Sequence, residues 1–208
     1  FILDLRNNPG GLLSQAIGVV DLFVDKGVIV SQKGKDKNSE ESFEASAFNT
    51  VTKLPVVVLV NGGSASASEI VSGALQDYKR AIVVGEKTFG KGSVQAVLPI
   101  TKDRTENIKL TIAKYYLPSG RTIQAKGVTP DIISFAGNVT EEKDSEFKIK
   151  EADLKKHLEG ELEKVDGKKE KKENTDEKTI ITKDEVSKDN QLNTAIGILK
   201  SLIIINKQ

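Results

Sequence analysis

The sequence predicts an α/β fold, because apolar strand-like runs alternate with amphipathic segments up to about residue 131. Two runs, LPVVVLVN (54–61) and RAIVVGEK (80–87), are rich in β-branched residues, which is typical of strands buried on both faces. The segment between them, SEIVSGALQDYK (68–79), has its apolar residues at helical spacing. This alternation favours an α/β core over an all-helical or all-strand fold.

The N-terminal part reads as a strand, a turn, a helix and a second strand. Residues 1–5 form a short apolar run, and the RNNPGG that follows is rich in turn residues. Residues 12–23 place their apolar side chains close to helical spacing. The next strand is KGVIVSQK (26–33), and the polar GKDKNSEESFEA (34–45) is expected to be a solvated loop or hairpin tip.

The rest of the apolar part contains more strands and turns. TFGKGSVQAVLPI (88–100) reads as a glycine-punctuated loop that leads into a strand. NIKLTIAKYYLPSG (107–120) and TIQAKGVTPDI (122–132) add further strands and turns. We therefore expect one core domain over residues 1–135.

The composition changes sharply after the core. Of the 50 residues from 141 to 190, 30 are charged, 17 of them acidic and 13 basic. A segment with so little apolar content predicts a flexible, solvated linker, which we place at residues 136–190. QLNTAIGILKSLI (191–203) returns to helical spacing, so a C-terminal helix is expected over residues 191–208.

Composition excludes several classes of protein. The net charge of +1 gives no strong field for nucleic acid or an anionic membrane. The absence of cysteine excludes disulfides, thiol catalysis and cysteine-ligated metal. We expect no signal peptide and no membrane span within these residues, because no apolar run approaches the roughly 20 residues that span a bilayer. Because the chain opens without Met on what reads as a strand, we expect a fragment of a longer polypeptide.

The stretch NGGSASASEI (61–70) offers three serines at a strand-to-helix junction. Ser66 stands three residues before Glu69, which is the spacing of a capping box. The same turn would place the Ser66 hydroxyl beside the free N–H groups of the first helical turn, where an oxyanion could bind. Both interpretations of Ser66 stay open, whereas Ser64 and Ser68 read as turn and helix-face residues.

A nucleophilic serine needs a base, and histidine is a poor candidate in this chain. The only histidine, His157, lies in the charged region and reads as a solvated surface residue, so the sequence argues against a Ser-His-Asp triad. A lysine can serve instead where burial lowers the pKa of its amine. Lys91 is the strongest candidate, because its neighbours Gly90 and Gly92 let the backbone approach another element closely.

The same glycine-rich stretch narrowly misses a phosphate-binding loop. The spacing from Gly85 to Gly90 and Lys91 fits, but Gly92 stands where Ser or Thr is required to hold magnesium. The following residues are strand-like rather than helical. The sequence therefore argues against nucleotide binding.

Five blocks in order resemble the carboxy-terminal processing proteases, also called tail-specific proteases. They are FILDLRNNPGGLL, VVVLVNGGSASASEIVSGALQD, VVGEKTFGKGSVQ, LTIAKYYLPSGRTIQ and GVTPDI. DNQLNTAIGILKSL near the end is also similar to the C-terminal helix of that family. The resemblance implies a serine endopeptidase with a Ser-Lys dyad that cleaves proteins near or from their apolar C-terminal tails.

The resemblance also assigns roles to particular residues. The family nucleophile falls on Ser66, and the lysine base on Lys91, 25 positions later. A supporting glutamine falls on Gln95, where its amide could orient the lysine amine. Glu69 matches an acidic residue whose role looks auxiliary, such as helix capping.

The same resemblance also implies a fold for the core and a site for the oxyanion. The family core is similar to the crotonase-like and Clp-protease-like β/α spiral. The backbone N–H of Ala67 and that of Gly10 or Gly11 would hold the oxyanion. We expect no cofactor and no metal.

The expected partners are protein substrates with apolar C-terminal tails. The family often places a PDZ domain before the core, so the parent chain is expected to carry one, and a second copy of the chain is a further candidate partner. Family membership implies an exported protein of the bacterial cell envelope or periplasm. Two alternatives remain: a crotonase-type acyl-CoA enzyme, and a non-catalytic scaffold of the same fold that binds protein tails.

Overall fold

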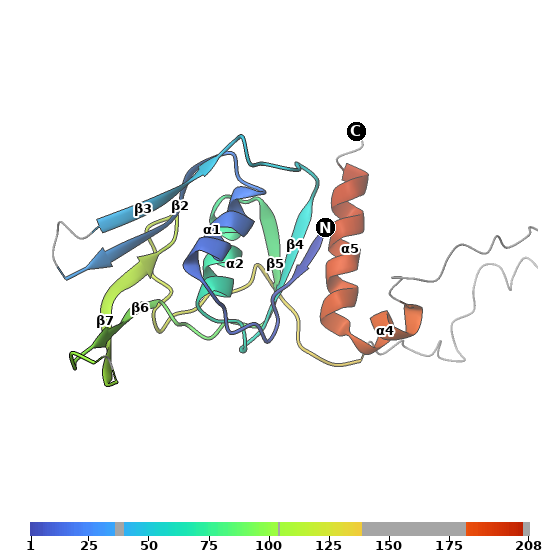
Figure 1. The fold of residues 1–208 in the computed structure, drawn as a ribbon. Coiled ribbons are helices and arrows are strands. Elements are labelled where there is room, and N and C mark those ends of the chain that lie inside the picture. Colours follow the sequence, from blue (N-terminus) through green and yellow to red (C-terminus); the bar gives the residue numbers. More distant parts are fainter. Residues whose placement is uncertain (36–39, 104, 139–181, 206–208) are drawn as a thin grey trace, which may run out of the picture.

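A computed structural model describes residues 1–35, 40–103, 105–138 and 182–205 of the chain (Figure 1). Helices and strands are interspersed along the described residues, which confirms the predicted α/β class. The crotonase-like or Clp-like spiral remains a prediction. The elements in chain order are β1 (Ile2–Asp4), α1 (Leu13–Asp21), β2 (Lys26–Gly34), β3 (Glu40–Ser46), β4 (Val56–Val60), α2 (Ala67–Asp77), β5 (Ala81–Gly85), β6 (Ser93–Pro99), β7 (Asn107–Tyr116), β8 (Ile132–Ile133), α4 (Lys183–Lys188) and α5 (Asn190–Ile205).

The strands form two sheets of different kinds. The first is parallel, with the strand order β1-β4-β5-β8, and it pairs Leu3 with Val58 and Val58 with Val83. The second is antiparallel, with the order β3-β2-β7-β6. Every residue of β4 is buried, as its unbroken β-branched run predicts for a central parallel strand.

Helices α1 and α2 lie between the two sheets (Figure 1). Each presents an apolar stripe to the sheets, and this packing creates the main hydrophobic core. The largest apolar side chains of this core that are at most 1% exposed are Ile29, Ile70, Leu75 and Ile123.

Helix α5 covers the other face of the parallel sheet (Figure 1). Its side chains Leu192, Ala195, Ile198 and Leu199 pack against Val57 and other apolar residues of β4 and β5. The parallel sheet is buried on both faces because α5 covers the face that α1 and α2 leave open, and this second apolar cluster is the contact between them. The segment expected as a helix at 191–208 thus corresponds to α5.

The parallel arrangement determines where loops meet. Strands β1, β4 and β5 all run the same way, so the loops that follow them gather at one edge of the sheet. These loops contain residues 5–12, 61–66 and 86–92. All of the candidate site residues except Glu69 and Gln95 lie in these loops or at the first residue of α2.

One strand was not predicted. Residues 40–46, expected to belong to a loop or hairpin tip, form β3, which pairs with β2 along its length. Phe43 and Ala45 alternate with polar residues and pack against the core, but this short alternation is hidden among many polar side chains.

Most of the charged segment falls outside the described residues, and so does His157. Only its two ends are described, residues 136–138 and the stretch from residue 182, which contains α4. Across the described ranges, no helix is both long and apolar enough to cross a membrane.

Candidate active site

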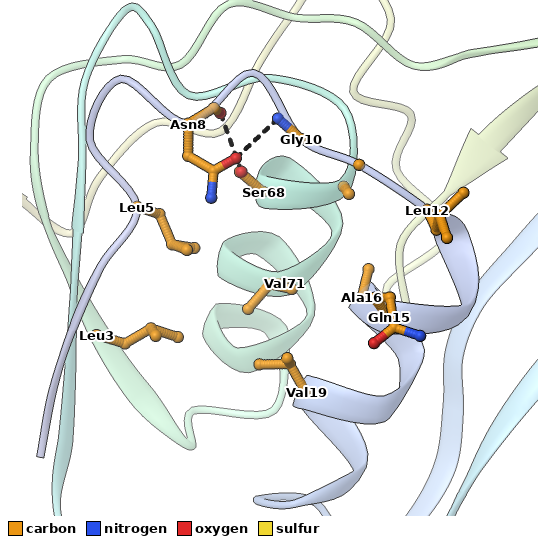
Figure 2. Close-up of a pocket in the computed structure, with 12 residues that line it drawn as sticks. Leu3, Leu5, Asn8, Gly10, Leu12, Gln15, Ala16, Val19, Ser68 and Val71 are labelled. Atoms are coloured by element: carbon orange, nitrogen blue, oxygen red, sulfur yellow. Dashed lines mark hydrogen bonds between the residues drawn. The ribbon is translucent and has the colours of Figure 1, made fainter.

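The loop after β1 is bonded directly to the turn that carries Ser66. The Asn8 carbonyl accepts hydrogen bonds from the Ala65 N–H and, as Figure 2 shows, from the Ser68 hydroxyl, both at 3.0 Å. These two donors flank Ser66 in the chain. The loop at residues 7–11 is therefore fixed against both sides of the candidate nucleophile.

Ser66 sits at the N-cap of α2 in a strained conformation, with φ 55° and ψ −114°. It stands in the predicted capping-box arrangement with Glu69, whose carboxylate accepts the Ser66 N–H at 2.9 Å. In the other half of the box the Glu69 N–H faces the Ser66 side chain, and it donates to the Ser66 carbonyl at 2.9 Å. Ser66 is partly exposed, and among the described residues its hydroxyl donates no hydrogen bond. The cap therefore leaves the proton of this hydroxyl available for transfer.

The neighbouring serines have structural roles, as the sequence indicated. Ser64 is fully buried, and its hydroxyl donates to the Leu5 carbonyl at 2.7 Å and accepts the Asn61 N–H at 3.0 Å. Ser68 is 3% exposed, and its hydroxyl donates to Asn8. Both hydroxyls are thus committed to the backbone.

Glu69 lies at the centre of the site, and its side chain is fully buried. Besides the Ser66 N–H, it accepts the Thr88 hydroxyl at 2.5 Å, the Gly90 N–H at 2.7 Å and the Lys91 N–H at 2.8 Å. Four donors match the acceptor-only capacity of an ionised carboxylate. Glu69 therefore does more than cap a helix: it binds the loop of the candidate base to the turn of the candidate nucleophile.

Lys91 lies between two glycines with special backbone positions. Gly90 before it has φ 96°, and Gly92 after it lies against the backbone of Gln124. A side-chain carbon on Gly92 would lie 2.5 Å from the Gln124 nitrogen, so only glycine permits this contact. This is the close approach that the sequence predicted. In the part of the chain that the structure describes, the partly buried Lys91 amine has no carboxylate within ion-pair distance.

Gln95 lies on β6 directly after an irregularity in the pairing with β7, between Val94 and Gln95. Its side chain is exposed, and among the described residues it makes no hydrogen bond to Lys91. Its role in orienting the lysine amine stays a prediction.

The candidate oxyanion donors lie side by side. A side-chain carbon on Gly10, which has φ 97°, would lie 2.8 Å from the Ala67 nitrogen. The Gly10 N–H is already donated to the Asn8 side chain at 2.9 Å (Figure 2). Within the described residues, the N–H groups of Gly11 and Ala67 have no hydrogen-bond partner. Of the two candidate glycines, Gly11 is therefore the one whose N–H, like that of Ala67, is available to an oxyanion.

An apolar pocket of about 190 Å³ opens beside these donors (Figure 2). Gly10, Gly11 and Ala67 form part of its wall, so it adjoins the candidate oxyanion site. A dry cavity of about 150 Å³ can hold a benzene ring, so this pocket can accept one apolar side chain. Its apolar lining comes from Leu3, Leu5, Leu12, Ala16, Val19 and Val71.

Residues 1–134 match the family model of peptidase family S41. The chain belongs to peptidase family S41. It is 46% identical over 167 residues to the carboxy-terminal-processing protease of Bartonella bacilliformis, which covers 80% of this chain and 38% of that protein. It is also 46% identical over 142 residues to the carboxyl-terminal-processing protease of a Synechocystis strain, covering 65% of this chain and 32% of the relative.

A solved structure, the photosystem II D1 C-terminal processing protease, superimposes on this S41 chain with a TM-score of 0.59 at 39% identity. The match covers 64% of this chain and 34% of that structure. The chain therefore spans about a third of the length of these relatives. The resemblance read from the five sequence blocks is confirmed at the level of the family.

Sequence reasoning missed one member of this S41 site. Thr88 is 5% exposed; its hydroxyl donates to Glu69 and accepts the Val128 N–H at 2.7 Å. Its position three residues before Lys91 was the only available signal, and a lone threonine in a glycine-rich loop has many explanations. Among the described residues there is no cluster of acidic or histidine side chains that could hold a metal ion.

Proposed function

We propose that this chain is the catalytic part of a serine endopeptidase in which Ser66 is the nucleophile and Lys91 the base. One observation carries the proposal: of the three serines at the turn, only Ser66 has a hydroxyl that donates no hydrogen bond within the described residues. That hydroxyl belongs to the residue just before Ala67, whose N–H likewise has no partner in the described part of the chain.

The proposed mechanism is acyl transfer. The unprotonated Lys91 amine takes the Ser66 hydroxyl proton while the oxygen attacks a peptide carbonyl carbon. The N–H groups of Ala67 and Gly11 stabilise the resulting oxyanion. The C–N bond then breaks, Lys91 returns the proton to the leaving amine, and water hydrolyses the acyl-enzyme with the same lysine as base.

The apolar pocket supports a preference for apolar substrates. Its wall includes Gly11 and Ala67, so a carbonyl held by their N–H groups would place a neighbouring side chain at the pocket mouth. The curated relatives are named for carboxy-terminal processing. We therefore infer that the substrates are proteins with apolar C-terminal tails, cleaved in the bacterial envelope, and that the parent protein presents them through a PDZ domain.

The test uses the full-length parent protein and an unfolded substrate with an apolar C-terminal tail. Ser66→Ala and Lys91→Ala should both abolish cleavage, and Lys91→Arg should too, because a guanidinium stays protonated. Lys87→Ala is the matched control, since Lys87 is exposed in the same loop. Mass spectrometry after treatment with a fluorophosphonate should place the adduct on Ser66. Cleavage that persists in Lys91→Arg would overturn the dyad.

The scaffold alternative makes the opposite prediction. A non-catalytic homologue would bind the tail saturably but leave it intact, and Ser66→Ala would not alter that binding. In the part of the chain that the structure describes, the Ser66 hydroxyl donates no hydrogen bond and the Lys91 amine has no ion pair, and both facts favour the peptidase, because a pure binding module has no use for either group.

A further inference from the structure

The start of α5 reaches the loop that precedes the candidate oxyanion glycines. The Arg6 guanidinium makes a bidentate pair with Asp189, with nitrogen–oxygen distances of 2.8 Å and 2.7 Å. It also donates to the Gln191 side-chain oxygen at 3.2 Å. The Arg6 and Asp189 side chains are 18% and 27% exposed, so solvent screens this pair less than a surface pair.

The helix end is itself firmly held. The Asp189 carboxylate accepts the Leu192 N–H at 3.0 Å, which caps the first turn of α5. Gln191 is 1% exposed and donates to the Ser134 carbonyl at 2.8 Å. Arg6 is also fixed from the other side by Asp4, with distances of 2.7 Å to 3.2 Å. Arg6 is thus held between the first strand and the last helix.

From Arg6 a continuous set of contacts runs into the candidate site. Its neighbour Asn7 has φ 56°, donates its N–H to the Asn61 side chain at 2.8 Å and accepts the Asn61 amide at 3.0 Å. Asn8 then bonds the two sides of the Ser66 turn and the Gly10 N–H. A change in the position of Arg6 is therefore passed to the 7–11 loop through backbone that has little freedom to absorb it.

We propose that Asp189 and Gln191, at the start of the C-terminal helix, position the candidate oxyanion loop through Arg6. The packing of α5 on the core then determines whether the 7–11 loop is placed correctly for catalysis, although α5 contributes no reacting group. The inference rests on the proposed function for its consequence in catalysis, while the mechanical link can be measured without any catalysis.

The experiment measures amide hydrogen exchange of residues 7–11 and cleavage kinetics in the full-length protein. Asp189→Asn keeps the shape and helix-capping oxygen but weakens the ion pair, and Gln191→Leu removes the second contact. Asp25→Asn is the matched control, because Asp25 pairs with Lys53 at an exposed site outside the contacts that join α5 to the 7–11 loop. All proteins are compared at the same interval below their own melting temperatures.

Asp189→Asn and Gln191→Leu should raise exchange in residues 7–11 at least tenfold, leave exchange in β4 unchanged, and lower kcat more than KM. Asp25→Asn should change neither. Unchanged exchange in residues 7–11, or an equal rise across the whole core, would overturn the proposal. If the wild-type protein cleaves nothing, the proposed function fails, yet the exchange result still decides the mechanical link.

Discussion

The amide nitrogens of Ser66 and Lys91 donate to the same oxygen, Oε2 of Glu69, at 2.9 Å and 2.8 Å. The two backbones are therefore held within two hydrogen-bond lengths of each other, although 25 positions separate them in the chain. The fully buried Glu69 carboxylate holds these two backbones rigidly, because the cost of its desolvation is offset only while all of its hydrogen-bond donors stay in place. The relative placement of the candidate nucleophile and base thus depends on a residue that reacts with neither.

Glu69→Gln should impair both stability and activity. An amide presents an NH2 group where a carboxylate oxygen now accepts two donors, so at least one buried N–H loses its acceptor. We expect a loss of about 3 kcal/mol in the free energy of unfolding and at least about a hundredfold loss of cleavage. Denaturant unfolding and peptide cleavage measure these. The control is Glu44→Gln, an exposed residue of β3. Full activity in Glu69→Gln would refute the mediating role.

Two adjacent glycines should respond very differently to alanine. A side-chain carbon at Gly10 would lie 2.6 Å from the Ala65 carbonyl oxygen, and its φ of 97° is strained for alanine. At Gly11 nothing lies within 4 Å. Gly10→Ala should therefore abolish cleavage and lower the melting temperature, whereas Gly11→Ala should fold normally. Circular dichroism melts together with cleavage rates decide this. Equal melting temperatures for the two variants would contradict the close approach.

Val19→Phe should narrow the apolar pocket. Val19 is only partly buried, so the larger ring can enter the pocket without disturbing the main core. A pocket contact is worth about 1–3 kcal/mol of discrimination, so kcat/KM for substrates with a bulky apolar residue at the cleaved bond should fall about 10- to 100-fold. Substrates with alanine there should be nearly unaffected. Uniform loss across both substrates would show that the pocket does not select the side chain.

The Arg6–Asp189 pair predicts a defined pH dependence of stability. Hydrogen bonding from Arg6 holds the pKa of Asp189 below its usual value of 3.8, and the bonds that Arg6 donates to Asp4 and Asp189 raise the pKa of Arg6. A carboxyl with a lowered pKa in the folded state stabilises fully above pH 3.8 and loses that contribution as pH falls through the lowered value.

Wild-type protein should exceed Asp189→Asn by about 2 kcal/mol at neutral pH. The difference should stay constant on acidification until the pH nears 3.8 and then shrink as the pH falls further. Denaturant titrations of both proteins across this range measure it. A difference that already declines above pH 5 or so would assign the effect to another group.

Much of this arrangement was predictable from the sequence, for reasons specific to each element. The unbroken apolar run of β4 and the helical stripe of α2 are strong local signals, and the Ser66–Glu69 spacing located the helix start. Strand β3 was missed because only Phe43 and Ala45 mark its buried face.

Contacts between residues that are distant in the sequence could not be predicted from the sequence. The Glu69 carboxylate is joined to Thr88 and Lys91 by folding alone, and no spacing rule relates a helix residue to a loop some 20 positions later. Likewise, the choice of Gly11 over Gly10 as a free donor depends on the Asn8 side chain accepting the Gly10 N–H. The residue types make these hydrogen bonds possible, but only the three-dimensional structure determines which of them form.

The bond between Arg6 and Asp189 also has a consequence in time, because the two residues are 183 positions apart. A ribosome that makes the chain from its N-terminus produces the serine and the lysine long before Asp189 emerges. Closing so long a loop costs only slightly more entropy than closing one of half the length, since the cost grows with the logarithm of length. The nascent protein thus holds its candidate nucleophile and base early, but the loop beside them receives its contact with Asp189 only after the 98 positions from Lys91 to Asp189 have been made.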